Sequence, residues 1–253
     1  MKHSVTCIAF AASLVATGAS AEIVGETFEY TVGDTVFEGY AARNTNLEQT
    51  RGTVMIVHDW DGMTAYEERR ADMLAALGYT AVAIDVYGRD TDPQSVDEYR
   101  QLSGALYQDR DLFRERLLGS LDAISDVEGS TDDVVVIGYC FGGAAVLEMA
   151  RAGADVEGYV SFHGGLGTPE GQDYAATQAP VLLLHGSADP VSGMSDLATL
   201  IDQLQSNGVE HAARVFGGAR HAFTVWDSQD YDARADRGSW NALQGFLQEN
   251  LGS

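Results

Sequence analysis

The chain is poor in cysteine and in positive charge. Of its 253 residues only Cys7 and Cys140 carry a thiol, and 15 lysine and arginine residues face 38 aspartate and glutamate residues, for a formal net charge of −23. A chain this acidic is repelled by a phosphate backbone, so we do not expect nucleic acid as a partner. The acidic residues are spread along the sequence instead of forming a tail, which is typical of a strongly solvated surface.

Long apolar runs are missing as well, except near the beginning. A short basic start is followed by apolar residues 8–15 and small residues at 19–21, the pattern of a secretory signal cut before Glu22. No Arg-Arg pair precedes the apolar residues, which favours general export over the twin-arginine route. No later run is long enough to span a bilayer. We therefore expect a signal peptide over 1–21, then a single domain over 22–253 of a soluble, periplasmic or secreted protein with no membrane attachment.

Signal cleavage would leave Cys140 as the only cysteine, because Cys7 lies in the expected leader. An intramolecular disulfide is then impossible. A free thiol in an oxidising compartment is a liability unless it is buried or used. This observation favours a functional role for Cys140.

Strand and helix patterns alternate through the rest of the chain, whose composition, 45% hydrophobic and 21% charged, suits a globular domain. Alternating residues at 27–32 and 35–42, around Gly33-Asp34, predict an N-terminal β-hairpin. Apolar strands are then expected at 53–57, 80–85, 134–137, 156–162, 181–185 and 211–216. Helical periodicity is found at 64–78, 95–127, from 144, 192–206 and 231–251. The alternation predicts an α/β fold, a mostly parallel central sheet flanked by helices on both faces.

The stretch Gly138-Tyr139-Cys140-Phe141-Gly142 joins a predicted strand to a predicted helix. It is a nucleophile-elbow pattern with sulfur in place of a serine oxygen. A turn this tight crowds backbone against backbone, so both glycines must lack a Cβ. The N–H of Phe141 would lie at the helix start, where it favours a developing oxyanion. A phosphate-binding loop fits poorly, because no Lys-Ser/Thr pair follows, while a buried structural cysteine is the simpler alternative.

Two more reactive residues follow later strands. Asp189 and His221 each come after an apolar strand, and strand ends of parallel sheets meet at one edge. Nucleophile, acid and histidine in this chain order are typical of the α/β-hydrolase fold. His221 would take the thiol proton and Asp189 would orient the imidazole. Taken singly, Asp189 could be a turn residue and His221 an exposed histidine.

The sequence resembles the dienelactone hydrolases, cysteine-dependent members of the α/β-hydrolase fold, over nearly all of the expected mature chain. The matching pieces are Gly138 to Gly143, His185-Gly186 with Asp189-Pro190, His221-Ala222-Phe223, Val57 to Trp60, and Asp85 to Arg89. The resemblance implies that Cys140, Asp189 and His221 form a catalytic triad. It also implies an oxyanion hole made by the N–H groups of Trp60 and Phe141.

The chain departs from this family at two positions. A family glutamate that modulates the thiol is replaced by the shorter Asp59, which could keep Cys140 neutral or simply cap its loop. Arg89 matches one of two family arginines that bind a substrate carboxylate, but Val225 stands in place of the other. Arg220 could compensate for that loss. Small or neutral esters and lactones are therefore plausible substrates alongside dienelactone.

Other histidines do not suggest a metal. His58, His163 and His185 end three different predicted strands without a local ligand motif, so hydrogen bonding and packing explain them better. We expect no metal, no cofactor and, by default, a monomer.

Three functions are compatible with these patterns. The leading one is an exported thiol hydrolase that cleaves a small lactone or carboxylic ester through a thioester on Cys140. The second is a binding protein for a small molecule that keeps the fold without catalysis, which the changes at Asp59 and Val225 would permit. The third is a redox-sensing thiol, against which the absence of a resolving cysteine argues.

Overall fold

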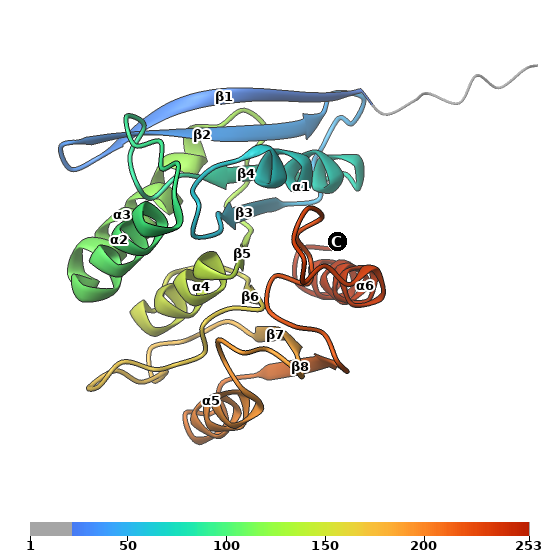
Figure 1. The fold of residues 1–253 in the computed structure, drawn as a ribbon. Coiled ribbons are helices and arrows are strands. Elements are labelled where there is room, and N and C mark those ends of the chain that lie inside the picture. The colour runs from blue at the N-terminus through green and yellow to red at the C-terminus, as the bar shows by residue number, and fades with distance from the viewer. Residues whose placement is uncertain (1–21, 253) are drawn as a thin grey trace, which may run out of the picture.

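The computed structural model describes residues 22–252, and the expected signal peptide lies outside them. The described residues form an eight-stranded sheet with the order β1-β2-β4-β3-β5-β6-β7-β8 (Figure 1). The strands are β1 Ile23–Val32, β2 Thr35–Asn44, β3 Thr53–Val57, β4 Thr80–Ile84, β5 Val134–Tyr139, β6 Gly158–Phe162, β7 Val181–Gly186 and β8 His211–Phe216. The helices are α1 Ala65–Ala76, α2 Val96–Gln108, α3 Arg110–Ala123, α4 Phe141–Ala152, α5 Met194–Ser206 and α6 Ala233–Asn250, with a short 3-10 turn, η1, at Ile124–Asp126.

The N-terminal hairpin is confirmed. Strands β1 and β2 pair antiparallel from Ile23 and Asn44 to Val32 and Thr35, so that two residues form the turn. Gly33 has a φ of 58°, which a two-residue turn needs and which a residue with a Cβ rarely adopts. Strand β2 also pairs antiparallel with β4, and this pairing joins the hairpin to the rest of the sheet.

The remaining strand pairs are parallel, from β4 through β3, β5, β6 and β7 to β8. Every residue of β3, β4 and β5 is buried, as expected for strands covered on both faces. Because the strands run the same way, their carboxyl ends lie at one edge of the sheet. The predicted mostly parallel α/β architecture is confirmed.

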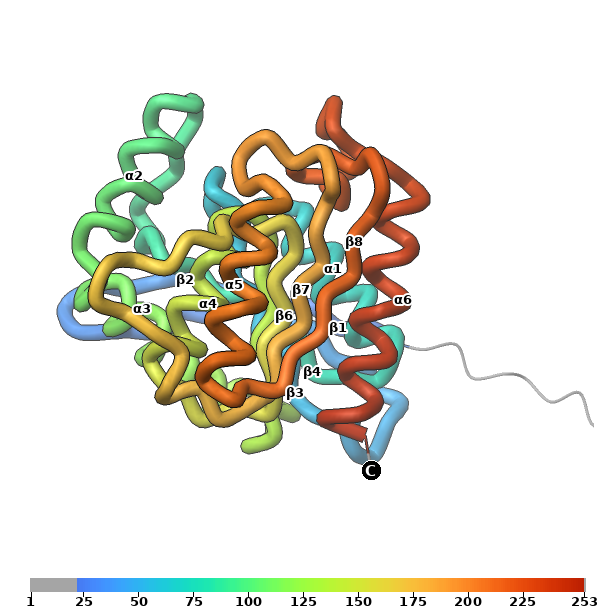
Figure 2. Tube along the Cα trace, turned by 90° about the horizontal axis from the view of Figure 1, so that it is seen from below, coloured from blue at the N-terminus to red at the C-terminus, as the bar shows by residue number. Residues whose placement is uncertain are grey.

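Two apolar layers hold the helices against the sheet. Helices α1 and α6 cover one face, with Leu74 and Leu247 packed over Val54 and Ile56, while α3, α4 and α5 cover the other. Figure 2 shows α5 and α6 on opposite sides of β7 and β8. The split follows from side-chain alternation along a strand, since Met55 and Val57 point to the face opposite to Val54 and Ile56.

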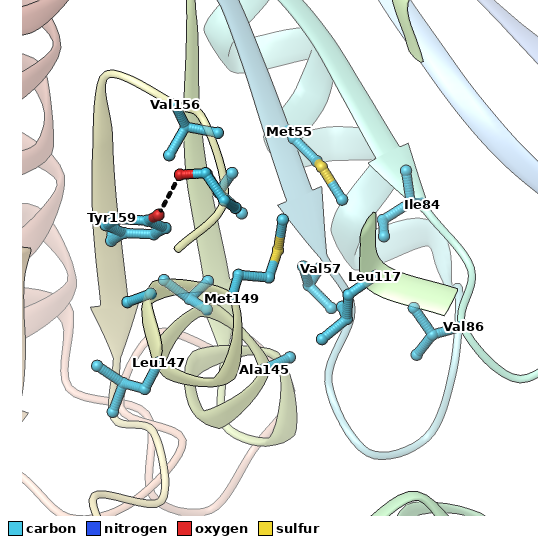
Figure 3. Close-up of a cluster of buried hydrophobic side chains, with 14 of the residues drawn as sticks. Met55, Val57, Ile84, Val86, Leu117, Ala145, Leu147, Met149, Val156 and Tyr159 are labelled. Carbon is cyan, nitrogen blue, oxygen red and sulfur yellow. Dashed lines mark hydrogen bonds between the residues drawn. The ribbon is translucent and has the colours of Figure 1, made fainter. Parts of the chain in front are cut away.

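The layer under α4 is closely filled with apolar side chains (Figure 3). Met149 and Ala145 of α4 face Met55 and Val57 of β3, and Leu117 of α3 completes the contact. These side chains are fully buried, and each large one stabilises the fold by about 1.5–3 kcal/mol. The packing fixes α4, whose first residue follows Cys140, relative to the sheet.

Local sequence explains the main helix boundaries. The Thr64 side chain caps α1 and the Glu67 side chain reaches back to the Thr64 N–H, which together form a capping box. The helical region 95–127 is divided at Asp109, whose carboxylate accepts a hydrogen bond from the Leu112 N–H and starts α3. Within residues 22–252 no helix is long and apolar enough to cross a membrane.

The packing at the start of α4 predicts a large effect of a single methyl group. A Cβ at Gly142 would lie 2.1 Å from the Val57 carbonyl oxygen, so Gly142→Ala should lower the free energy of unfolding by about 3 kcal/mol or more. Gly245, in the middle of α6, has nothing within 4 Å of such a Cβ. Gly245→Ala should therefore raise the stability by about 0.5–1 kcal/mol. Urea unfolding of both variants checks this, and equal midpoints would contradict the described turn.

Candidate active site

The residues singled out from the sequence lie after the carboxyl ends of four parallel strands. Asp59 and Trp60 follow β3, Cys140 follows β5, Asp189 follows β7 and His221 follows β8. In the sheet β3 and β5 are direct neighbours, and β6 separates β5 from β7. Parallel strands and short loops therefore bring residues together that are as far apart in sequence as 59 and 221.

Cys140 occupies a strained turn between β5 and α4. Its φ is 51° and its ψ is −108°, an unfavourable backbone conformation for a residue with a Cβ. A Cβ at Gly138 would lie 2.2 Å from the Gly142 carbonyl oxygen, and one at Gly142 would lie 2.1 Å from that of Val57. This confirms that both glycines are required to lack side chains. The turn directs Cys140 away from β5 and places the Phe141 N–H in the first turn of α4.

Cys140, His221 and Asp189 form a continuous hydrogen-bonded row. The Cys140 Sγ lies 2.9 Å from His221 Nε2, and His221 Nδ1 lies 2.8 Å from Asp189 Oδ2. The other carboxylate oxygen of Asp189 accepts hydrogen bonds from the N–H groups of Val191 and Ser192. Burial acts to raise the pKa of Asp189, but these hydrogen bonds, first among them that of His221, outweigh it and lower the pKa. Asp189 is thus an anion that holds a proton on His221 Nδ1 and leaves Nε2 facing the sulfur.

Asp59 places a negative charge near the thiol. Its carboxylate is buried, and its Oδ1 accepts the Trp60 N–H at 2.5 Å. Burial of the thiol first, and then the charge of Asp59, raise the pKa of Cys140 well above its ordinary value. Burial and the charge of Asp61 in turn raise the pKa of Asp59 to about 6. The resting sulfur is therefore a neutral thiol, and the Trp60 N–H is occupied by a carboxylate.

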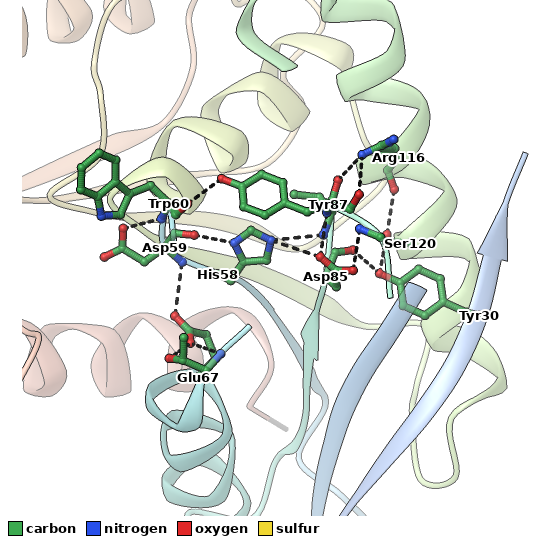
Figure 4. Close-up of polar contacts among 12 residues, drawn as sticks. Tyr30, His58, Asp59, Trp60, Glu67, Asp85, Tyr87, Arg116 and Ser120 are labelled. Atoms are coloured by element: carbon green, nitrogen blue, oxygen red, sulfur yellow. Dashed lines mark hydrogen bonds and ion pairs between the residues drawn. The ribbon is translucent and has the colours of Figure 1, made fainter. Parts of the chain in front are cut away.

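A buried polar network supports Asp59 and Trp60 (Figure 4). Glu67 Oε1 accepts the Asp59 N–H, and the pKa of Glu67 is raised to about 7, mainly by burial. His58 Nδ1 donates to the Asp59 carbonyl oxygen and its Nε2 accepts the Val86 N–H. The Tyr87 hydroxyl donates to the Trp60 carbonyl oxygen at 2.9 Å. These contacts fix the backbone that carries the Trp60 N–H.

His58 is thus a hydrogen-bonding residue in this structure, and so is His185, whose Nε2 lies 2.8 Å from the Ser192 carbonyl oxygen. Between residues 22 and 252 there is no group of three or more His, Cys, Asp or Glu side chains that could hold a metal ion.

Aromatic rings from α2 and α3 surround Phe141. The rings of Tyr107 and Phe113 lie 5.5 and 5.3 Å from that of Phe141, and Tyr87 lies at 5.6 Å. Trp60 packs at 5.5 Å against Tyr99. Tyr99 and Tyr107 were not singled out from the sequence, because their helical spacing looked like that of any helix packed on a core. They place aromatic rings of α2 against Trp60 and Phe141.

Arg89 and Arg220 are each paired with carboxylates of this chain at the surface. The exposed Arg89 guanidinium pairs with Glu29 Oε1 at 2.9 Å and Asp90 Oδ1 at 3.2 Å. Arg220 pairs with Asp230 Oδ1 at 2.8 Å. The charged side chains that influence the Cys140 thiol most are Asp59 and Asp61, both negative.

A cysteine in a tight strand-turn-helix at the centre of a mostly parallel sheet, with an acid and a histidine on later strand ends, is typical of the α/β-hydrolase fold. The model of the dienelactone hydrolase family matches residues 37–251. The chain therefore belongs to the dienelactone hydrolase family, whose members are hydrolases of esters and lactones. The resemblance noted in the sequence is confirmed.

Individual relatives agree with this assignment. One relative with a solved structure is a dienelactone hydrolase-like promiscuous phosphotriesterase from metagenomic libraries. Its sequence is 30% identical to this chain, and the match covers 90% of this chain and 98% of the relative. The two structures superpose with a TM-score of 0.84. An Escherichia coli O157:H7 protein provisionally named a carboxymethylenebutenolidase is 25% identical over 94% of this chain and 92% of its own. A Bradyrhizobium sp. protein provisionally named a 2-oxo-3-(5-oxofuran-2-ylidene)propanoate lactonase is 25% identical over 78% of this chain and 84% of its own.

The charge of Asp59 near the thiol predicts a change in the pH dependence of thiol reactivity. Asp59→Asn removes a negative charge that raises the pKa of Cys140, so the thiolate should form at lower pH. We expect alkylation of Cys140 by iodoacetamide at pH 7 to become several-fold faster, with the rate profile displaced to lower pH.

Asp61→Asn is the matched control for this experiment. Asp61 raises the pKa of Cys140 less than Asp59 does, so its displacement of the profile should be smaller. An unchanged or upward-displaced profile in Asp59→Asn would contradict the description of the resting thiol.

Proposed function

We propose that the chain is a thiol hydrolase that cleaves small, uncharged carboxylic esters or lactones through a Cys140–His221–Asp189 triad and a thioester intermediate. The observation that carries the proposal is the unbroken row of contacts from the Cys140 Sγ to His221 Nε2 at 2.9 Å and from His221 Nδ1 to Asp189 Oδ2 at 2.8 Å. An imidazole so placed takes a thiol proton without any rearrangement of the chain.

In the first step the Cys140 thiol proton moves to His221 Nε2 while the sulfur attacks the carbonyl carbon. The carbonyl oxygen becomes an oxyanion, for which the N–H groups of Trp60 and Phe141 are the donors. Collapse of this intermediate breaks the carbon–oxygen ester bond, and the imidazolium Nε2–H protonates the departing alkoxide. The acyl group remains on Cys140 as a thioester, and in a lactone the new hydroxyl stays attached to it.

In the second step a water molecule replaces the leaving group. His221 Nε2 takes a proton from the water as it attacks the thioester carbonyl, and the same two N–H groups hold the second oxyanion. The carbon–sulfur bond then breaks, the carboxylic acid leaves, and the sulfur recovers its proton from His221. Asp189 keeps Nδ1 protonated throughout and stabilises the imidazolium that forms in each step.

Asp59 gives the proposed site an inactive resting state. Its carboxylate occupies the Trp60 N–H and places a negative charge near the thiol, so it has to leave the N–H when a substrate carbonyl enters the oxyanion hole. Until then the sulfur stays a neutral thiol, the form that resists oxidation. This suits a free cysteine in an oxidising compartment.

The charges around the thiol favour an uncharged substrate. Asp59 and Asp61 repel a carboxylate, and Arg89 is already paired with Glu29 and Asp90. Val225 supplies no charge where the family has its second arginine. A neutral phosphotriester, the substrate class named for the metagenomic relative, meets the same requirement.

The test compares initial rates on p-nitrophenyl acetate, dienelactone and paraoxon, with Cys140→Ala as the blank and Asp59→Asn and Glu29→Gln as further variants. We expect turnover of the neutral ester, at least about 10³-fold lower in Cys140→Ala, and a much weaker activity on the anionic dienelactone. Glu29→Gln releases one partner of Arg89, so it should improve dienelactone hydrolysis if Arg89 can reach a substrate.

Two outcomes would contradict the proposal. Full activity in Cys140→Ala would exclude the thiol as the nucleophile. Binding of these esters without turnover by the wild type would favour a binding protein that keeps the fold.

We also propose that the chain is exported and cut before Glu22, which the composition of residues 1–21 and the protected thiol support. Expression in a Gram-negative host should give a periplasmic protein whose intact mass corresponds to residues 22–253. Recovery of the uncut chain from the cytoplasm would refute this.

A further inference from the structure

Backbone conformation draws attention to a residue that the proposed mechanism does not use. Between residues 22 and 252, three residues other than glycine have a positive φ: Cys140 at 51°, His163 at 39° and Ala222 at 54°. Cys140 is the proposed nucleophile, and Ala222 directly follows the proposed base, His221. Strained backbone of this kind concentrates at functional sites. His163, at the end of β6, is the third member of the set.

His163 touches both halves of the proposed Cys–His pair. It is fully buried, and its Nδ1 accepts the Cys140 N–H at 3.2 Å, a donor that the Phe162 carbonyl oxygen shares at 3.0 Å. Its ring meets that of His221 edge to face, with ring centres 5.3 Å apart. Its Nε2 lies 2.8 Å from Thr224 Oγ1, on the loop that carries His221.

These contacts fix the tautomer of His163. Because Nδ1 accepts an N–H, it carries no proton, so the proton is on Nε2 and is donated to Thr224 Oγ1. Burial first, and then the charge of His221, hold the pKa of His163 well below its ordinary value. The ring is therefore neutral and does not repel the imidazolium that His221 becomes during the reaction.

Thr224 is itself held by α1, which is paired with α6 through Arg70. Its hydroxyl lies 2.7 Å from the Tyr66 hydroxyl, and its carbonyl oxygen accepts a hydrogen bond from Arg70 Nη2 at 2.9 Å. The buried Arg70 of α1 also pairs with Asp236 of α6 at 2.7 Å. The Arg70 guanidinium is surrounded by the aromatic rings of Tyr66, Tyr139, Trp226 and Trp240. A line of contacts thus runs from α1 and α6 through Thr224 and His163 to the backbone of Cys140.

We propose that His163 is a positioning residue, a neutral imidazole that holds the Cys140 turn and the His221 loop in register through its hydrogen bond to Thr224. The proposal rests on the proposed function in that it assigns a task within the same Cys–His pair. Its consequence is that cutting the His163–Thr224 contact misaligns the sulfur and His221 Nε2, even though neither residue is changed.

The chain offers a matched set of variants. His163→Asn puts an amide oxygen where the His163 Nδ1 accepts the Cys140 N–H. The new side chain tolerates a positive φ and is too short to reach Thr224. Thr224→Val keeps the shape of Thr224 and removes its acceptor, while Thr224→Ser keeps the hydroxyl. The double variant His163→Asn/Thr224→Val changes both partners of the same hydrogen bond.

The primary measurement is the rate constant for alkylation of Cys140 by iodoacetamide at one pH, which requires no ester. Hydrolysis of p-nitrophenyl acetate gives kcat and KM, and thermal unfolding reports stability. We expect His163→Asn and Thr224→Val each to lower the alkylation rate and kcat by roughly tenfold with little change in KM. Thr224→Ser should stay close to wild type, and the double variant should be no worse than the slower single variant.

Other results would overturn the proposal. Wild-type alkylation in Thr224→Val would show that the contact does not position the pair. Equal losses of alkylation rate in Thr224→Ser and Thr224→Val would show that the Thr224 hydroxyl does not position the pair. If the losses of the two single variants multiply in the double variant, His163 and Thr224 act separately. If His163→Asn fails to fold, the Thr224 pair decides alone. Failure of the wild type to hydrolyse the ester would refute the proposed function but leave the alkylation test of His163 intact.

Discussion

The close approach of the turn after β5 to the end of β3 is the constraint on which the rest of the site depends. Gly142 lies so near the Val57 carbonyl oxygen that no side chain fits between them, and Gly138 is crowded in the same way by Gly142. This contact forces Cys140 into an unfavourable backbone conformation and places the Phe141 N–H at the start of α4. Apolar packing of α4 on β3 stabilises the fold enough to maintain that strain. The position of the sulfur is therefore fixed by the packing of β3, β5 and α4 and not by the conformation of a loop.

The polar groups around the sulfur are arranged to keep it unreactive at rest. Asp59 is held by a network that includes His58 and Glu67, and it raises the pKa of the thiol while it occupies the Trp60 N–H. On the opposite side, Asp189 orients His221 toward the same sulfur. A carbonyl oxygen that displaces Asp59 would move its negative charge away from the thiol and free the Trp60 N–H at once. The short side chain of Asp59 places its carboxylate on the N–H of the next residue, Trp60.

Much of this could be predicted from the sequence because it depends on local patterns. Apolar runs, helical periodicity and glycines indicate strands, helices and turns, and strand ends indicate where Cys140, Asp189 and His221 meet. Contacts between residues remote in sequence could not be predicted in this way. Arg70 and Asp236 are 166 positions apart, and neither belongs to a motif. Arg89 matched a family position, yet its pairing with Glu29 depends on how the hairpin lies beside β4. His163 followed a strand, as His58 and His185 do, and only its positive φ and its contacts with Cys140 and Thr224 distinguish it.

The central claim, that Cys140 carries the acyl group during turnover, can be tested most directly by trapping the intermediate. Wild-type protein mixed with excess p-nitrophenyl acetate would be quenched in acid at intervals, digested and analysed by mass spectrometry. The account predicts an acetyl thioester on the peptide that contains Cys140, formed and lost at least as fast as product appears. Product release without any acyl group on that peptide, or an acyl group on another residue that turns over at the rate of product formation, would contradict it.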